Sequence, residues 1–222
     1  MIWVNRIHDP VVRSLALAFS PIPEILEELK AGKVIVLTDD EHRENEGDFV
    51  CAAEFATPEV INFMLHVGRG VLCVALEGQI CDALKLAPMT EDNTAQLGTA
   101  FTITVDCVAD LGVTTGVSAS DRSITVKQLA KEDAVPDDFD RPGHINPLRA
   151  ADGGVLARVG QTEGSVDLCR LANLRPAAAI IEIMNENGDM ARVPDLEVLI
   201  KKYDLKMCSV ADVAAYRRSL EG

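Results

Sequence analysis

The chain has 222 residues, of which 48% are hydrophobic and 25% charged, and its formal net charge is −14. These proportions are typical of a globular protein with one well-buried core or two small domains. The negative charge argues against a nucleic-acid-binding surface and against binding to anionic membranes, because both need clustered cations.

Cysteine occurs six times, without a Cys-x-x-Cys or Cys-x-x-His pair, so neither a zinc site nor a redox motif is supported. The N-terminus lacks the long apolar stretch of a secretory signal, and no apolar run approaches the roughly 20 residues of a membrane span. We therefore expect a soluble, cytoplasmic protein with reduced cysteines.

The first half of the chain predicts helices that alternate with strands. Apolar residues at helical spacing indicate a helix over 23–30, and the apolar run 34–37 indicates a buried strand. Thr57 followed by Pro58 predicts a helix start, because threonine caps free N–H groups and proline fits the first helical position. A second apolar strand is expected over 71–76, a mobile or functional loop over 85–98, and an alternating strand over 101–105.

The second half continues the alternation. Ser120 or Asp121 is expected to cap a helix that ends at 129, and the acidic, proline-bearing stretch 131–143 is expected to be a surface loop. The remaining expectations are a helix over 162–171 capped by Thr162, a strand over 177–184, a turn at 187–188, a helix from Pro194 and a last helix from Ser209 to 218. No repeat or flexible linker interrupts the chain, so residues 1–222 are expected to form a single domain.

The segment 38–48 is the most informative one. Eight of its eleven residues are ionisable, and it follows the apolar run 34–37 directly. Its acidic side chains offer the hard oxygen ligands that suit Mg²⁺, and Arg43 offers a fixed fork for an anionic group. The alternative is a solvated acidic loop without a specific ligand, because runs of charged residues are usually exposed to solvent. The acidic residues are Asp39, Asp40, Glu41, Glu44, Glu46 and Asp48.

Three further polar clusters fall at turns or helix starts. The turn 114–118 carries hydroxyl and backbone N–H groups that could hold a phosphate, although a purely structural turn is favoured. His144 follows Arg-Pro-Gly, and a histidine held in such a loop is a candidate acid or base. Arg158 precedes the start of a helix, where N–H groups favour an anion; an ordinary capped helix with a surface arginine is the alternative.

Glu182 lies inside the apolar run 177–184, where a carboxylate is unusual. Partial burial would suit it to proton transfer, and a salt-bridged structural glutamate remains the alternative. Cys73, in the apolar run 71–76, is expected to be a small core residue rather than a reactive thiol.

In combination these motifs resemble the 3,4-dihydroxy-2-butanone 4-phosphate synthase family of riboflavin biosynthesis. The resemblance extends from about residue 23 to residue 217, and its specific segments are 39–48, 57–59, 112–118, 141–144 and 184–188. It implies an α+β fold, compact and three-layered, with a mixed, twisted β-sheet flanked by helices. It also implies a homodimer that converts D-ribulose 5-phosphate to L-3,4-dihydroxy-2-butanone 4-phosphate and formate with Mg²⁺ or Mn²⁺.

The resemblance also implies roles for individual residues. Catalysis is expected to use Glu44, Asp48, His144 and Glu182. The sugar phosphate is expected to contact Arg43, Asp48, Thr115, Arg158, Gly160, Thr162 and Glu182. The metal ion is expected to bind Glu44 and Gln161. Proton transfers at these groups and a Lewis-acidic metal suit a reaction that enolises, dehydrates and rearranges a sugar.

Two positions depart from the family pattern. Gln161 replaces a histidine that ligates metal in the family, and Asn146 replaces a residue that is usually aromatic. A neutral amide oxygen can coordinate Mg²⁺, but it cannot act as a base. The chain is therefore a working synthase with an altered metal site, a homologue that performs a partial or different rearrangement of a pentulose phosphate, or an impaired or engineered variant. Two further classes stay open: another metal-dependent lyase or isomerase of phosphorylated sugars, and a sugar-phosphate binder without turnover.

Overall fold

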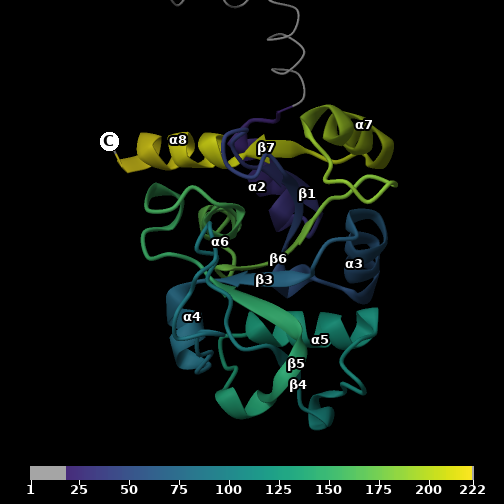
Figure 1. The fold of residues 1–222 in the computed structure, drawn as a ribbon, viewed down its shortest axis with the longest axis vertical. Helices are drawn as coiled ribbons and strands as arrows, with labels where there is room; N and C mark the ends of the chain where they lie inside the picture. The colour runs from purple at the N-terminus through teal and green to yellow at the C-terminus, as the bar shows by residue number, and fades with distance from the viewer. Residues whose placement is uncertain (1–18, 222) are drawn as a thin grey trace, which may run out of the picture.

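The computed structural model describes residues 19–221, and its centre is a seven-stranded mixed sheet in the order β4-β5-β3-β6-β2-β1-β7 (Figure 1). Strand β1 is parallel to β7 and β3 is parallel to β5, whereas the other neighbouring pairs are antiparallel. The strands are β1 Ile35–Thr38, β2 Gly47–Ala52, β3 Cys73–Leu76, β4 Val105–Cys107, β5 Phe139–Arg149, β6 Ala177–Glu182 and β7 Met207–Ser209.

Helices cover both faces of the sheet. One face packs against α2, α6 and α8, and the opposite face packs against α3, α4, α5 and α7. The helices are α2 Ile22–Lys30, α3 Pro58–Phe63, α4 Gly78–Ala83, α5 Ala119–Leu129, α6 Gln161–Leu171, α7 Val193–Tyr203 and α8 Val210–Glu221. A π-helix, Met64–Gly68, continues α3. The expected α+β fold with a mixed sheet between helical layers is confirmed.

Burial on both faces explains the continuous apolar runs that indicated strands. Along β2, Phe49 and Cys51 enter the core under α3 and α5, while Val50 and Ala52 enter the core under α2 and α6. Several local signals are also confirmed. The Thr57 hydroxyl accepts from the Val60 backbone N–H at 3.3 Å, and the Ser209 hydroxyl accepts from the Asp212 N–H at 3.1 Å.

The loop expected over 131–143 is wrong from residue 139 onward, because β5 begins at Phe139 and includes His144. The first half of β5 pairs with the short strand β4 at the end of the sheet, where polar side chains reach solvent, and Pro142 obscures the strand pattern. The strand expected over 101–105 is also wrong, since β4 is Val105–Cys107 and Phe101 makes only an isolated bridge. The cap of α5 is Ser118 and not Ser120 or Asp121.

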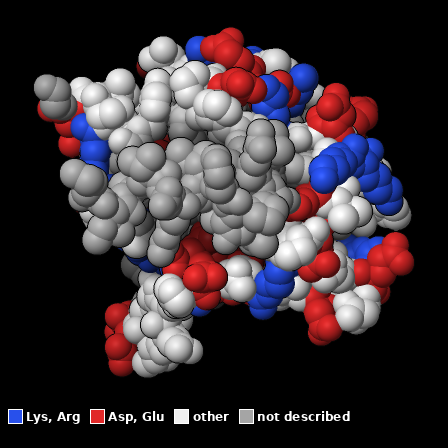
Figure 2. Space-filling model, turned by 90° about the horizontal axis from the view of Figure 1, so that it is seen from above, with Lys and Arg blue, Asp and Glu red and all other residues white. Residues whose placement is uncertain are grey.

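Acidic and basic side chains are interspersed on the face seen from the end where α7 and α8 lie (Figure 2). Between residues 19 and 221, no helix has both the length and the apolar character that a bilayer crossing needs. The single domain expected for residues 1–222 stays a prediction.

Candidate active site

Asp39 organises the acidic loop that connects β1 to β2. Its Oδ1 accepts from the Glu46 backbone N–H at 2.9 Å, and its Oδ2 accepts from the Glu44 N–H at 2.9 Å. The same Oδ2 accepts from the Arg43 guanidinium at 2.9 Å, and the carboxylate is fully buried. Asp39 therefore fixes the shape of the loop. Because its own carboxylate is occupied, the neighbouring side chains of the loop are the candidates for binding a ligand.

Arg43 links the acidic loop to the start of α6. Its Nη1 donates to Glu44 Oε2 at 2.9 Å and to Gln161 Oε1 at 2.8 Å, in addition to Asp39. The two residues expected to bind metal thus share one guanidinium nitrogen. A cation placed between these two oxygens would have to displace Arg43, because like charges repel at such short distances.

Asp48 and Glu182 lie side by side because they are directly paired in the register of β2 and β6. Asp48 is 5% exposed, and its Oδ1 has no hydrogen-bond partner within the described residues. Burial raises the pKa of Asp48 well above its ordinary value, and the nearby carboxylates of Glu182 and Glu44 raise it further. A buried carboxyl with a raised pKa is a candidate to hold a proton and pass it on during a reaction.

A close backbone approach holds Glu182 in place. The Val71 backbone N–H donates to Glu182 Oε2 at 2.8 Å. A Cβ at Gly70 would lie 2.5 Å from the same oxygen, so only glycine fits there. Glu182 is partly buried and has no ion pair among residues 19–221, which favours the functional interpretation over the salt-bridged one.

Arg158 lies at the start of α6 on the opposite side of the cavity. Its Nη1 donates to Glu163 Oε2 at 2.6 Å, and its Nη2 donates to the Leu97 carbonyl at 3.1 Å. Gly160 permits this arrangement, because a Cβ there would lie 2.4 Å from Arg158 Nη1. Thr162, in the first turn of α6, lines the same cavity as Arg158, and the N–H groups of a first helical turn favour an anion.

These side chains line one cavity of about 130 Å³ on the face of the sheet that α6 covers. Seven of the expected site residues line it, namely Arg43, Glu44, Asp48, Arg158, Gln161, Thr162 and Glu182; Glu46, Cys73, Val71 and Phe101 line it as well. Burial, reinforced by Glu182 and Asp48, raises the pKa of the Cys73 thiol. A thiol in that state is inert, which agrees with the expected core role.

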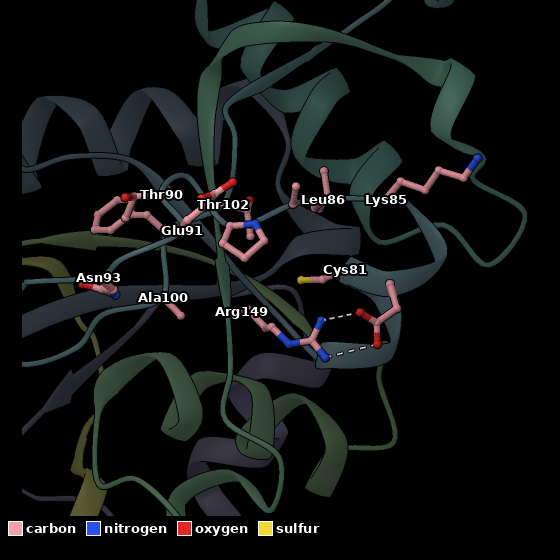
Figure 3. Close-up of a pocket in the computed structure, with 13 residues that line it drawn as sticks. Cys81, Lys85, Leu86, Thr90, Glu91, Asn93, Ala100, Thr102 and Arg149 are labelled. Atoms are coloured by element: carbon pink, nitrogen blue, oxygen red, sulfur yellow. Dashed lines mark hydrogen bonds and ion pairs between the residues drawn. The ribbon is translucent and has the colours of Figure 1, made fainter.

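A larger cavity of about 720 Å³ lies beside this one, between α4 and the segment 85–102, and Phe101 lines both. Figure 3 shows Arg149 turned toward α4, where it forms a two-point ion pair with Asp82 at 2.6 and 3.1 Å. The smaller cavity holds two arginines and four carboxylates, whereas in the larger one Arg149 is paired with Asp82, so the smaller cavity is the better candidate for acid–base chemistry on a charged sugar.

His144 and Thr115, two expected site residues, lie outside the smaller cavity. His144 Nδ1 lies 2.6 Å from Asp106 Oδ2. The N–H groups of Thr115 and Gly116 donate to the Asp121 carboxylate at 3.3 and 3.1 Å. The proposed phosphate cradle at 114–118 is therefore filled by a side chain of the protein itself.

The strand register nevertheless places His144 close to the cavity. Asn146 of β5 pairs with Cys73, and Cys73 pairs with Ile180 of β6. Beyond Cys73 the β3–β6 register shifts by one residue, as the bridge between Arg69 and Ile183 shows, so His144 and Glu182 lie near the same end of β3 on strands that flank it. Two strand spacings correspond to about 10 Å between their backbones.

Sequence reasoning missed Asp106 and Glu163, whose carboxylates contact His144 and Arg158. Neither showed a local signal of its own, since each acts on a residue that the fold brings to it. A glutamate in the first turn of a helix is a weak sign, because it is common at ordinary helix starts.

The donor set of the cavity fits a divalent cation. Four carboxylates line it, those of Glu44, Glu46, Asp48 and Glu182. Burial raises the pKa of Glu46, and repulsion from Glu44 raises it further, so a cation would relieve the crowding of charge. Among residues 19–221 no three His, Cys, Asp or Glu side chains form a metal-binding group. Mg²⁺ needs no such group, because it keeps several waters and uses one or two carboxylates.

An open mixed sheet with carboxylates and two arginines in one cavity defines an enzyme-like site for an anionic, hydroxylated ligand. Residues 23–216 match the family model of 3,4-dihydroxy-2-butanone 4-phosphate synthase. The chain therefore belongs to the 3,4-dihydroxy-2-butanone 4-phosphate synthase family.

Similar proteins agree with this assignment. The chain is 51% identical over 199 residues to riboflavin biosynthesis protein RibBA of Aquifex aeolicus, covering 90% of this chain and 49% of that protein. It is 48% identical over 202 residues to 3,4-dihydroxy-2-butanone 4-phosphate synthase of Neisseria meningitidis serogroup B, covering 91% and 55%. The chain thus spans about half the length of these curated relatives.

A solved structure is also similar. A crystal structure of 3,4-dihydroxy-2-butanone 4-phosphate synthase in complex with two magnesium ions matches with a TM-score of 0.87 and 40% identity, covering 92% of this chain and 99% of that chain. This solved structure thus has the same fold as the chain. Its two magnesium ions agree with the divalent-cation donor set of the cavity described above.

Proposed function

We propose that this chain converts D-ribulose 5-phosphate to L-3,4-dihydroxy-2-butanone 4-phosphate and formate, as a step of riboflavin biosynthesis. The observation that carries the proposal is the cavity in which Asp48 and Glu182 are paired across β2 and β6 between Arg43 and Arg158. Acids that move protons lie next to cations that hold a phosphate, as enolisation and rearrangement of a sugar phosphate require.

The phosphate is bound at the start of α6. Arg158 supplies the charge, the N–H groups of the first helical turn supply donors, and the Thr162 hydroxyl supplies another. Gly160 keeps the backbone close to the Arg158 guanidinium. Arg43 contacts the other anionic and hydroxyl oxygens of the substrate from the acidic loop.

A divalent metal ion, Mg²⁺ or Mn²⁺, would be held by Glu44, and Gln161 Oε1 would be a second ligand in place of its contact with Arg43. When bound, the ion stabilises the negative charge that develops on the substrate oxygens as a Lewis acid. The protein's own contribution is to hold Glu44 at the edge of the cavity through the loop that Asp39 organises.

Proton transfers use Asp48, Glu182 and His144. The raised pKa of Asp48 lets this carboxyl keep a proton and deliver it to a leaving hydroxyl group. Glu182, held by the Val71 N–H, accepts a proton from the substrate at its free oxygen. His144, whose Nδ1 lies 2.6 Å from Asp106 Oδ2, is the third group that exchanges protons with the substrate.

We also propose that the protein is a cytoplasmic homodimer. The apolar side chains of Val71 and Phe101 line the cavity and are 54% and 36% exposed, and Val159 beside Arg158 is 56% exposed. A second copy that covers them would remove apolar surface from water and close the cavity. Sedimentation at micromolar concentration measures this directly, and a strictly monomeric, fully active protein would contradict it.

The function is tested by ¹³C NMR of the protein with uniformly labelled ribulose 5-phosphate and Mg²⁺. Labelled formate together with a four-carbon phosphate is expected from the parent. The variant Glu182→Gln is the matched control and is expected to release neither. A five-carbon product would instead show a different rearrangement, and saturable binding without any product would show a sugar-phosphate binder.

A further inference from the structure

Arg192 contacts the main chain of the acidic loop. Its Nη1 donates to the Glu44 backbone carbonyl at 2.8 Å and also to the neighbouring carbonyl of Asn45. Neither carbonyl accepts from a backbone N–H among residues 19–221, so the guanidinium is the partner that the protein provides for them. Arg192 is partly buried and forms no ion pair within the same residues. Its contact with the loop is therefore through backbone oxygens and not through the acidic side chains.

The main chain of Glu44 is held at both of its polar groups. Its backbone N–H donates to Asp39 Oδ2 at 2.9 Å, and its carbonyl accepts from Arg192. Rotation of the chain at Glu44 would break one of these charge-assisted hydrogen bonds, which are roughly twice as strong as neutral ones. The direction in which the Glu44 side chain leaves the loop is thus set. That side chain lines the cavity and is 28% exposed.

The chain that follows Glu182 places Arg192. The Ala191 N–H donates to the Ile183 carbonyl at 2.9 Å, and the Ile183 N–H donates to the Gly47 carbonyl at 2.9 Å. The residue after Ala191 is Arg192, whose guanidinium reaches back to a loop 148 positions earlier in the sequence. This one side chain therefore joins the loop that carries one cavity carboxylate to the end of β6, which carries another.

Helix α7 gives the guanidinium a fixed origin. Arg192 is the N-cap residue of this helix, and its backbone N–H donates to Asp195 Oδ2 at 3.0 Å. Leu196, in the first turn of α7, is fully buried and packs against the end of the acidic loop. A Cβ at Gly47 would lie 2.4 Å from Leu196 Cδ1. The start of α7 thus contacts the loop twice, once through a cation and once through close packing.

We propose that Arg192 is a positioning residue for the metal site, which holds the acidic loop in the conformation that directs the Glu44 carboxylate into the cavity. The inference rests on the proposed function, in which Glu44 holds the divalent ion. Arg192 does not line the cavity, so it acts through the main chain of Glu44. Without its guanidinium the loop samples further conformations, and cation binding then carries the added cost of ordering the loop.

Hydrogen exchange of the metal-free protein measures the loop directly. Arg192→Met keeps a long side chain and removes every donor, whereas Arg192→Lys keeps a cation with three donors. In Arg192→Met the amides of Glu44 and Glu46, which donate to Asp39, are expected to exchange at least about tenfold faster than in the parent. The Val36 amide, which donates to the sheet, is expected to be unchanged. Equal acceleration at Val36 would show a global loss of stability and overturn the local role.

Binding of Mn²⁺ to the protein, followed by electron paramagnetic resonance, gives the second readout. Arg192→Met is expected to raise the Kd about tenfold, and Arg192→Lys by no more than about threefold. In a Glu44→Gln background, Arg192→Met is expected to change the Kd by no more than about twofold, because Arg192 acts through Glu44. An equal loss in both backgrounds would place the effect elsewhere and overturn the proposal, and so would a parent without measurable Mn²⁺ binding.

Formate release gives the third readout, because weakened metal binding and lost chemistry depend differently on metal concentration. At saturating Mn²⁺, Arg192→Met is expected to keep kcat within about threefold of the parent. At a Mn²⁺ concentration equal to the parent Kd, a tenfold weaker site is filled about fivefold less, and the rate should fall by that factor. A loss that saturating Mn²⁺ does not reduce would contradict a role through the metal site.

The matched control is Arg218→Met, which removes the same charge from an exposed position of α8. Its amide exchange, Mn²⁺ Kd and kcat are expected to match those of the parent. If the parent bound Mn²⁺ but released no formate, the proposed function would fail, and exchange and binding would still decide the role of Arg192. If the parent released formate and Arg192→Met matched it in exchange and binding, this inference would fail and the proposed function would stand.

Discussion

Substitution of Gly116 by alanine should disrupt the contact between Asp106 and His144. Gly116 is buried and has a φ of +82°, a left-handed conformation that costs a residue with a Cβ about 1–2 kcal/mol. The new methyl group would also lie 2.1 Å from Asp106 Oδ2 and 2.7 Å from His144 Nδ1. Overpacking of this kind typically costs a further 1–3 kcal/mol or so.

The combined loss in the free energy of unfolding is therefore about 2–5 kcal/mol. For a chain of this size that corresponds to a melting temperature lower by roughly 5–15 °C. Because the ring must also move away from Asp106, kcat should fall by at least about tenfold even at a temperature where the variant is fully folded.

The measurement combines urea unfolding, calorimetry and formate release, with Gly188→Ala as the control. Gly188 has a φ of +89°, and no atom lies within 4 Å of the position of its Cβ. The control should therefore lose only the conformational part, about 1–2 kcal/mol, and keep its activity. If both variants lost the same stability and the same activity, the steric argument for Gly116 would be refuted.

Three other substitutions test the cavity itself. Glu182→Gln should abolish formate release and leave unfolding unchanged, because the amide oxygen still accepts from the Val71 N–H; unchanged turnover would remove Glu182 from the mechanism. Asp48→Asn should stabilise the fold at pH 7 by about 0.5–2 kcal/mol. Burial raises the pKa of Asp48 in the folded chain, whereas in the unfolded chain this carboxyl loses its proton above about pH 4. Between that pH and the folded pKa the folded state binds more protons than the unfolded state, so the parent loses stability as the pH rises. Urea unfolding should show the gain at pH 7 and not at pH 3, and a gain at both would contradict the explanation. Gln161→His should tighten Mn²⁺ binding by about tenfold and raise formate release. Electron paramagnetic resonance measures the binding, and a variant that behaves like the parent would exclude position 161 as a metal ligand.

The sequence by itself determined much of the candidate cavity. Asp48 follows the loop 38–47 directly, and an apolar strand with a carboxylate near its end was visible at Glu182. Local periodicity also predicted α2, α6 and β6 nearly at their observed bounds. These features depend on neighbours within a few residues, and helix spacing, caps and strand alternation act over that range.

Only the tertiary structure decided which distant groups meet. The amide oxygen of Gln161 accepts a hydrogen bond from the guanidinium of Arg43, which lies 118 residues away in the sequence. His144 likewise contacts Asp106, 38 residues away. It also decided that residues 139–149 form a strand, because pairing with β3 and β4 outweighs a polar, proline-bearing sequence. Such contacts follow from sheet order and register, which depend on how whole elements pack and not on the spacing of residues along the chain.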